Sequence, residues 1–130
     1  KAALEKIHYT LKPLDIVLIW TGAGTYNDSE RYLTEHCGMT GESTNWLLDQ
    51  GVKMTGIDAI TYDRPVQTMY ELKQFWPAHR VMLDREYYHL ENMTNFESLP
   101  RPTGFKLAVF PVKWVNSTAA PVRAVAIFEE

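Results

Sequence analysis

The sequence predicts a mixed α/β domain in which short helices pack on a sheet. Apolar, β-branched runs at residues 15–20 and 52–59 have the length and composition of buried strands. Segments with helical spacing lie between and after them, bounded by proline, glycine or capping residues. The last third of the chain changes to two β-rich runs. This order of elements favours short helices on a mixed sheet.

The first predicted elements are a helix, a strand and a second short helix. Residues 2–9 place apolar side chains at helical spacing, and Pro13 prevents the helix from continuing. Residues 15–20 are apolar without alternation, which predicts a central strand buried on both faces. A short helix is expected at residues 30–36, after a polar loop.

The middle of the chain predicts a well-defined helix, a strand and a long loop. Thr40 is a suitable N-cap, and Gly51 a suitable left-handed stop, for a helix between them. Residues 52–59 then form the strand. From residue 61 to residue 78 the periodicity fades, and the stretch is aromatic and longer than most connections. We expect such a loop to line a functional site.

The remaining predicted elements alternate between helix and strand before a final hairpin. Pro77 suits the first turn of a helix, and Pro111 places its own strand at an edge or a bulge. The expected elements are, in order, a helix at 78–85, a strand at 87–93, a brief helix at 94–99, and strands at 105–115 and 121–128.

The composition is that of one globular domain over residues 1–130. The chain is 45% hydrophobic and 22% charged, and no run approaches the roughly 18 to 20 apolar residues of a membrane span. Thirteen basic and sixteen acidic residues give a net charge of 13 − 16 = −3. A negatively charged protein does not attract the phosphate backbone of a nucleic acid. We therefore expect neither nucleic acid nor a membrane as a partner.

The single cysteine, Cys37, limits the metal chemistry that is open to the chain. It excludes an intramolecular disulfide and a cysteine-rich zinc site, so any metal site must use histidine and carboxylate ligands. The chain opens with Lys1 inside a predicted helix and has no signal-peptide pattern. We expect a processed, truncated or partial chain, and a cytoplasmic protein by default.

His79 and Glu91 have the pattern of half a metal site. His79 falls in the first turn of a predicted helix, where the positive end of the helix dipole disfavours protonation of the imidazole. Glu91 follows twelve residues later (91 − 79 = 12) in a strand, where it shares a face with His89 and must face solvent or have a partner. Such residues are also common without metal. Asp58 and Asp63, near the end of the preceding strand, favour the metal interpretation.

An ordered set of segments resembles a known family. The segments are residues 15–22, 38–40 with 46–48, 52–59 with Asp63, His79 with Arg80, Glu91 and Asn92 with Asn95 and Leu99, and residues 121–124. Together they resemble the C-terminal half of the cyclase-family metal-dependent hydrolases, which include bacterial kynurenine formamidase and isatin hydrolase. The resemblance runs nearly end to end.

The resemblance implies a swivelling β/β/α type of fold and a divalent metal site for manganese or zinc. It implies hydrolysis of an amide or cyclic amide through a metal-activated water, with a small aromatic amide as substrate. His79 and Glu91 match two metal ligands of the family. We expect Asp58 and Asn92 to orient these ligands by hydrogen bonds.

Four further residues are candidates for contact with substrate. Tyr62, Phe75 and Trp76 belong to the aromatic loop and are expected to stack on a flat substrate. His89 stands where an apolar residue is usual in relatives. It either approaches the ion or hydrogen-bonds a neighbour, and we favour the neighbour, because an extra ligand would close the open position of a catalytic metal.

The family's H-x-G-T-H-x-D-x-P-x-H motif is absent from this chain. The resemblance implies that this motif supplies the other metal ligands and the histidine for proton transfer. We therefore expect a companion N-terminal chain or segment, without which the site is incomplete, and assembly into a homodimer or tetramer. Two alternatives stay open, which are a non-catalytic binding or assembly module that retains the fold, and a metal-dependent lyase or isomerase on the same scaffold.

Overall fold

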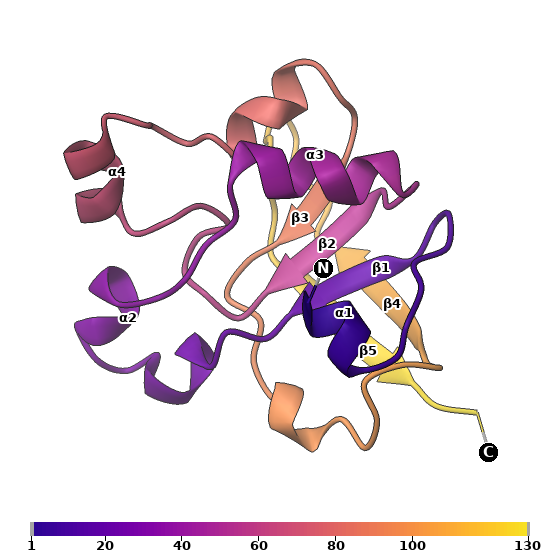
Figure 1. Cartoon of the computed structure of the whole chain (residues 1–130). Coiled ribbons are helices and arrows are strands. Elements are labelled where there is room, and N and C mark those ends of the chain that lie inside the picture. The colour runs from indigo at the N-terminus through magenta and orange to yellow at the C-terminus, as the bar shows by residue number, and fades with distance from the viewer. Residues whose placement is uncertain (1, 130) are drawn as a thin grey trace. The chain divides into compact units, whose positions relative to one another are not determined.

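The fold was analysed in a computed structural model, which describes residues 2–129 (Figure 1). The chain divides into two compact units, one formed by Thr10–Ser98 and the other by residues up to Tyr9 together with those from Leu99 onward. The predicted mixed α/β class with short helices is confirmed. The prediction that residues 1–130 fold as one domain stays a prediction.

The larger unit contains a parallel sheet of three short strands. These are β1 (Ile16–Ile19), β2 (Met54–Ile57) and β3 (Tyr88–Leu90), in the order β1-β2-β3. Leu18, Gly56 and Leu90 lie side by side in the register. The prediction that residues 15–20 form the central strand is wrong, because β2 is central and Ile16 at the start of β1 is exposed.

Helices of the larger unit are short, as the sequence predicts. They are η1 (Ala23–Tyr26), α2 (Arg31–Thr34), α3 (Gly41–Asp49), α4 (Val66–Leu72), η2 (His79–Leu83) and η3 (Phe96–Ser98). The Thr40 side chain caps α3 by accepting from Ser43 N, and Gly51 has the expected left-handed conformation. Two predictions need correction, because the stretch 61–78 contains helix α4 and the predicted helix at 78–85 is a 3-10 helix.

The hydrophobic core of the larger unit joins the sheet to the helices and the aromatic stretch. Ile57 at the end of β2 and Tyr62 beyond it have no exposed surface, and Leu48 of α3 and Val81 of η2 belong to the same buried cluster. Figure 1 shows α3 beside the sheet. Burial of this kind is the main force that fixes the elements carrying His79.

The smaller unit is built from one helix and one antiparallel hairpin. Helix α1 (Ala2–Lys6) precedes the sheet of the larger unit in sequence, while β4 (Lys106–Pro111) and β5 (Val122–Ile127) pair with each other. The rings of Phe105 and Phe128 pack at the open end of the hairpin, with centroids 5.1 Å apart. The predicted hairpin is confirmed, and Pro111 ends its strand.

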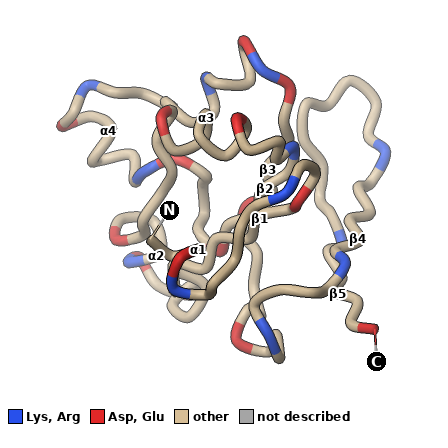
Figure 2. Tube along the Cα trace, turned by 45° about the vertical axis from the view of Figure 1, so that its right-hand side comes forward, with Lys and Arg blue, Asp and Glu red and all other residues tan. Residues whose placement is uncertain are grey.

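Figure 2 shows basic and acidic residues interspersed along the trace rather than gathered in runs of one sign. Among the described residues, none of the helices has the length and apolar character needed to span a membrane.

Candidate metal centre

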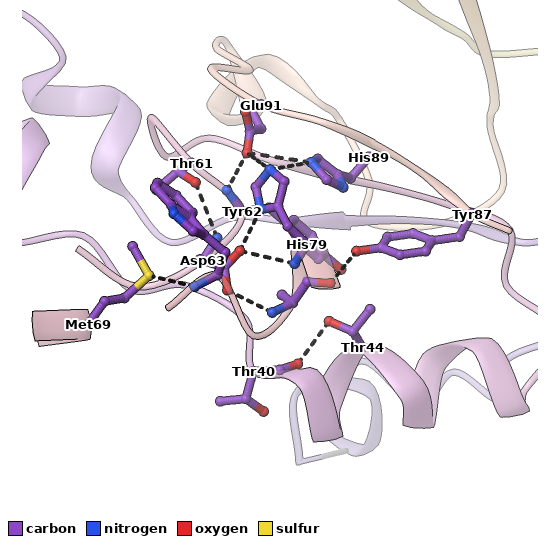
Figure 3. Close-up of polar contacts among 12 residues, drawn as sticks. Thr40, Thr44, Thr61, Tyr62, Asp63, Met69, His79, Tyr87, His89 and Glu91 are labelled. Carbon is purple, nitrogen blue, oxygen red and sulfur yellow. Dashed lines mark hydrogen bonds and ion pairs between the residues drawn. The ribbon is translucent and has the colours of Figure 1, made fainter. Parts of the chain in front are cut away.

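The two predicted metal ligands meet in the structure, although they come from different elements. His79 is the first residue of η2, and Glu91 directly follows β3. The Nε2 atom of His79 lies 3.5 Å from Oε1 of Glu91 (Figure 3). A backbone N–H of Tyr62, in the segment after β2, also points at this oxygen. The group therefore lies at the carboxyl ends of β2 and β3, where open parallel sheets place their sites.

Asp63 fixes the orientation of His79. Its carboxylate is fully buried and accepts the backbone N–H groups of Ala78 at 2.7 Å and His79 at 3.1 Å. It also lies 2.5 Å from Nδ1 of the His79 ring. Because a carboxylate accepts, Nδ1 carries the proton, and in the neutral imidazole Nε2 presents its lone pair toward Glu91.

The charge of Asp63 also changes the protonation of His79. The hydrogen bond to Asp63 raises the pKa of His79 above its ordinary value, against the opposing effect of burial, and the negative charge of Glu91 acts in the same direction. The expectation that a helix N-terminus keeps this imidazole neutral is therefore wrong. The segment is a short 3-10 helix, and the nearby carboxylates outweigh its dipole.

Glu91 is held as an anion by its neighbours. Burial alone would raise its pKa, but the nearby His89 imidazole, the N–H of Tyr62 at 2.6 Å and the charge of His79 reverse that effect and lower the pKa. The site thus keeps a charged carboxylate oxygen beside an imidazole nitrogen. This is the combination of donors that a divalent cation requires.

His89 lies closer to the pair than the sequence led us to expect. Its Nε2 is 3.2 Å from Nε2 of His79 and 3.6 Å from Oε1 of Glu91. Strand alternation correctly places it on the face of Glu91. His79, His89 and Glu91 form a group whose ligand atoms all lie within 4.8 Å of one another, so the group could hold a metal ion. Two imidazoles and one carboxylate suit Zn²⁺ and Mn²⁺.

In the described contacts, the side chains of Asp58 and Asn92 bond groups other than His79 and Glu91. Asp58 is buried and accepts the backbone N–H groups of Thr21, Gly22 and Gly24, together with the Thr21 hydroxyl. Its carboxylate therefore fixes the loop after β1. The Asn92 side chain accepts from the Tyr32 hydroxyl at 2.9 Å. Among the described contacts, Asp63 and the Tyr62 backbone orient the ligands instead.

The aromatic residues predicted to contact substrate have different surroundings. Tyr62 is fully buried, and its ring stacks on His89, so its ring positions the imidazole and is out of reach of a substrate. Phe75 packs edge-on against Tyr70. Trp76 is 41% exposed, and its ring forms a T-shaped pair with the His79 ring, with centroids 5.6 Å apart.

A shallow, open hollow of about 470 Å³ lies beside His79. It is lined by Trp76, His79, Arg80 and Leu83. Trp76 has a left-handed backbone with φ of 53°, a strained conformation for a bulky residue, and such strain is often found at functional sites. Arg80 and Leu83 were not predicted as site residues, because no sequence signal separates them from ordinary exposed residues of a short helix.

The chain matches one family model in sequence and several solved structures in fold. The sequence model of the Cyclase family matches residues 1–64. Among curated protein sequences, none matches the chain significantly.

Solved structures match nearly the whole chain. Isatin hydrolase A from Ralstonia solanacearum has 25% identity and a TM-score of 0.81, over 98% of this chain and 51% of that one. Isatin hydrolase A from Labrenzia aggregata has 24% identity and a TM-score of 0.82, over 99% and 52%. A potential metal-dependent hydrolase with cyclase activity has 21% identity and a TM-score of 0.73, over 98% and 58%. The chain thus spans about half the length of the solved structures it matches. The chain is therefore similar to the Cyclase family in sequence over residues 1–64, and it shares the fold of the isatin hydrolases.

Proposed function

We propose that this chain is the C-terminal half of a metal-dependent hydrolase that cleaves an amide or cyclic amide, such as an arylformamide or isatin, and that it supplies two ligands of the metal site. The observation that carries the proposal is the convergence of His79 Nε2 and Glu91 Oε1, 3.5 Å apart, with Asp63 on the other side of the imidazole. The family match and the fold shared with isatin hydrolases support the same class of reaction.

The cation in this proposal is Mn²⁺ or Zn²⁺. Imidazole nitrogen and carboxylate oxygen are ligands that both ions accept. A bound divalent cation supplies a Lewis acid for the scissile carbonyl and lowers the pKa of a water toward ~7.

The chain's own residues hold and orient the two ligands. Asp63 keeps the proton of His79 on Nδ1, so that Nε2 faces the cation position. The backbone N–H of Tyr62 fixes Oε1 of Glu91, so the carboxylate does not rotate freely. Because Asp63 and Tyr62 are themselves fully buried, this arrangement is set before any ligand binds.

A companion N-terminal segment supplies the rest of the active site in this proposal. It carries the H-x-G-T-H-x-D-x-P-x-H motif, with the remaining ligands and the histidine for proton transfer. Two facts support a companion segment. The motif is absent from this sequence, and the chain spans about half the length of the isatin hydrolases it matches.

The hollow beside His79 supports an aromatic amide as the substrate. Trp76 and the exposed Leu83 give it apolar surface next to the candidate ligand. A flat ring that lies against Trp76 would bring its amide carbonyl toward the cation position.

The test compares the wild-type assembly, including its companion segment, with the Glu91→Gln variant. Glutamine keeps the size of the side chain but removes its charge. We expect bound manganese or zinc, measured by elemental analysis, to fall, and turnover of an arylformamide and of isatin to fall by about 10- to 100-fold or more. The matched control is Glu97→Gln, an exposed carboxylate on η3.

Three outcomes separate the readings. Loss of metal and turnover in Glu91→Gln, with Glu97→Gln unchanged, supports the proposal. Unchanged metal and turnover in Glu91→Gln overturn it. Metal binding without turnover of either substrate in the wild-type assembly also overturns the hydrolase and favours the non-catalytic module.

A further inference from the structure

We propose that Arg80 is a specificity-determining residue of the hollow, and that it selects aromatic amides that also carry a carboxylate. The inference rests on the proposed hydrolase function and narrows its substrate class. In the arrangement that we propose, the substrate ring lies against Trp76, the amide faces His79, and the carboxylate binds the guanidinium of Arg80.

Arg80 lies where a substrate in the hollow meets it. It follows His79 directly in η2, and both residues line the hollow together with Trp76 and Leu83. The Nε2 atom of His79 lies beside Glu91 at the candidate metal centre. A molecule that fills the hollow therefore contacts a candidate metal ligand at one place and a cationic side chain at another.

The guanidinium of Arg80 has no anionic partner within the part of the chain that the structure describes. Arg80 is exposed, and its side chain forms no ion pair with another described residue. Arg85, just after η2, differs in this respect. Its Nη1 lies 2.8 Å from Asp49 Oδ1 and 3.0 Å from Asn45 Oδ1. The same segment thus contains one arginine that is bound to the fold and one whose charge is available to a ligand.

Backbone contacts fix the start of Arg80 relative to the aromatic wall of the hollow. The N–H of Arg80 donates to the carbonyl oxygen of Trp76 at 2.9 Å. The N–H of Trp76 donates in turn to the sulfur of Met69, a side chain that is fully buried in the larger unit. These contacts hold Trp76 in its left-handed conformation. A wall and a charge that are held in this way favour ligands with a matching distance between ring and anion.

The chemistry of the lining suits an aromatic carboxylate better than a neutral molecule. A guanidinium keeps its charge at physiological pH, and its planar fork of N–H donors matches the two oxygens of a carboxylate. The Trp76 ring and the Leu83 side chain, which is 76% exposed, are the apolar part of the lining. A neutral aromatic amide uses this apolar surface alone, whereas a carboxylated one also uses the charge of Arg80.

The experiment compares formanilide with 2-, 3- and 4-formamidobenzoate as substrates of the assembly that includes the companion segment. All four have the same scissile formyl amide and differ in whether, and where, the ring carries a negative charge. In Arg80→Gln we expect kcat/KM to fall by about 5- to 50-fold for at least one carboxylated substrate, mainly through KM. This range lies between the effect of an exposed ion pair and that of a charge-assisted hydrogen bond. For formanilide we expect no change.

Two variants and a change of salt serve as controls. Arg80→Lys keeps the charge without the planar fork, so it should retain part of the preference for the carboxylated substrate. Arg31→Gln removes the same charge from an exposed pair with Glu35 on α2 and should leave every ratio unchanged. In 1 M salt, where charges are screened beyond about 3 Å, the difference between the wild type and Arg80→Gln should shrink. Circular dichroism verifies that the variants fold.

Each outcome has one meaning. A loss in Arg80→Gln that is confined to carboxylated substrates, with partial retention in Arg80→Lys, supports the inference. An equal loss for all four substrates overturns it, because Arg80 then stabilises the assembly rather than binding the substrate. Unchanged kinetics in Arg80→Gln also overturn it, while turnover of formanilide leaves the proposed hydrolase intact. If the wild-type assembly hydrolyses none of the four, the inference fails, and turnover of isatin then decides whether the proposed function survives.

Discussion

Asp63 determines the geometry of the site without being a candidate ligand. It has no exposed surface, and its two carboxylate oxygens accept from Ala78 N, His79 N and His79 Nδ1. An imidazole that is held by a carboxylate keeps one tautomer and one ring orientation, which strengthens it as a metal ligand.

Replacement of Asp63 by asparagine should therefore weaken metal binding. Asparagine has one acceptor oxygen where aspartate has two, so His79 loses its fixed tautomer. We expect Zn²⁺ affinity to fall by about 10- to 100-fold, measured by calorimetry. Asp84→Asn changes an exposed carboxylate and serves as the control. Equal affinities in Asp63→Asn and the wild type would show that the imidazole is held by other contacts.

Single residues of the site were predictable to different degrees. The family resemblance selects His79 and Glu91, and strand alternation places His89 on the face of Glu91. The pairing of Asp63 with His79 spans sixteen residues and an intervening helix, so no local spacing rule predicts it. Asp58 has the right residue type and position for the site, but four donors of the loop after β1 occupy its carboxylate.

At the scale of elements, the approach of Gly38 to the site loop limits how that loop can move. A Cβ at Gly38 would lie 2.0 Å from the backbone oxygen of Asp63. Met39 N donates to Tyr62 O at 2.7 Å and fixes the same contact. The segment before α3 therefore positions the loop that carries both orienting groups.

We expect Gly38→Ala to displace that loop. The added methyl group overlaps backbone, so stability should fall by about 1–3 kcal/mol, and Zn²⁺ affinity should fall with it. Urea unfolding and calorimetry measure the two effects. A Cβ at Gly24 has its nearest contact at 3.5 Å, so Gly24→Ala should be nearly neutral. The contact is unimportant if both variants behave like the wild type.

Helix α3 depends on its N-terminal cap. Thr40 accepts from Ser43 N, and the Ser43 hydroxyl in turn accepts from Thr40 N. Thr40→Ala should lower the free energy of unfolding by about 1 kcal/mol, because a backbone donor loses its partner. Chemical denaturation measures the change against Thr94→Ala, an exposed threonine. A difference near zero between the two variants would contradict the importance of the cap.

Elements with clear end signals were predicted, and those without were not. Helix α3 has Thr40 before it and Gly51 after it, and both signals were visible in the sequence. Helix α4 begins after Pro65 with no side-chain cap, and it ends at Lys73 in a left-handed conformation that glycine normally adopts. Its sequence therefore gives neither signal. The order of the strands in the sheet could not be predicted either, because an apolar run does not indicate which strands pair with it.

At the scale of the whole molecule, the class of fold follows from the order of the elements, but the grouping of those elements does not. The mixed α/β class was predicted correctly from alternating strand and helix patterns. The division into two units was not predicted. The smaller unit joins the residues up to Tyr9 with those from Leu99 onward, and no local pattern in the sequence predicts contacts over such separations.

Metal binding should stabilise the molecule as a whole. A ligand that binds only the folded chain adds about 2.7 kcal/mol at a free concentration of 100 times its Kd. We expect Zn²⁺ to raise the urea midpoint and a chelator to reverse the change. His79→Gln should show no such response. An equal response in this variant would place the stabilising ion elsewhere.

The hydrogen bonds of Asp63 have a consequence for residues 64–77. These residues form a long loop between Asp63 and Ala78. The Asp63 carboxylate accepts the backbone N–H groups of Ala78 and His79, so it holds the two ends of the loop together. Helix α4 and the aromatic residues after it therefore belong to a loop whose two ends are fixed. Insertions, deletions or grafted segments can then alter what reaches the mouth of the hollow, while His79 keeps its place. Mutations selected for a new substrate preference should therefore disturb the metal ligands least when they fall within residues 64–77.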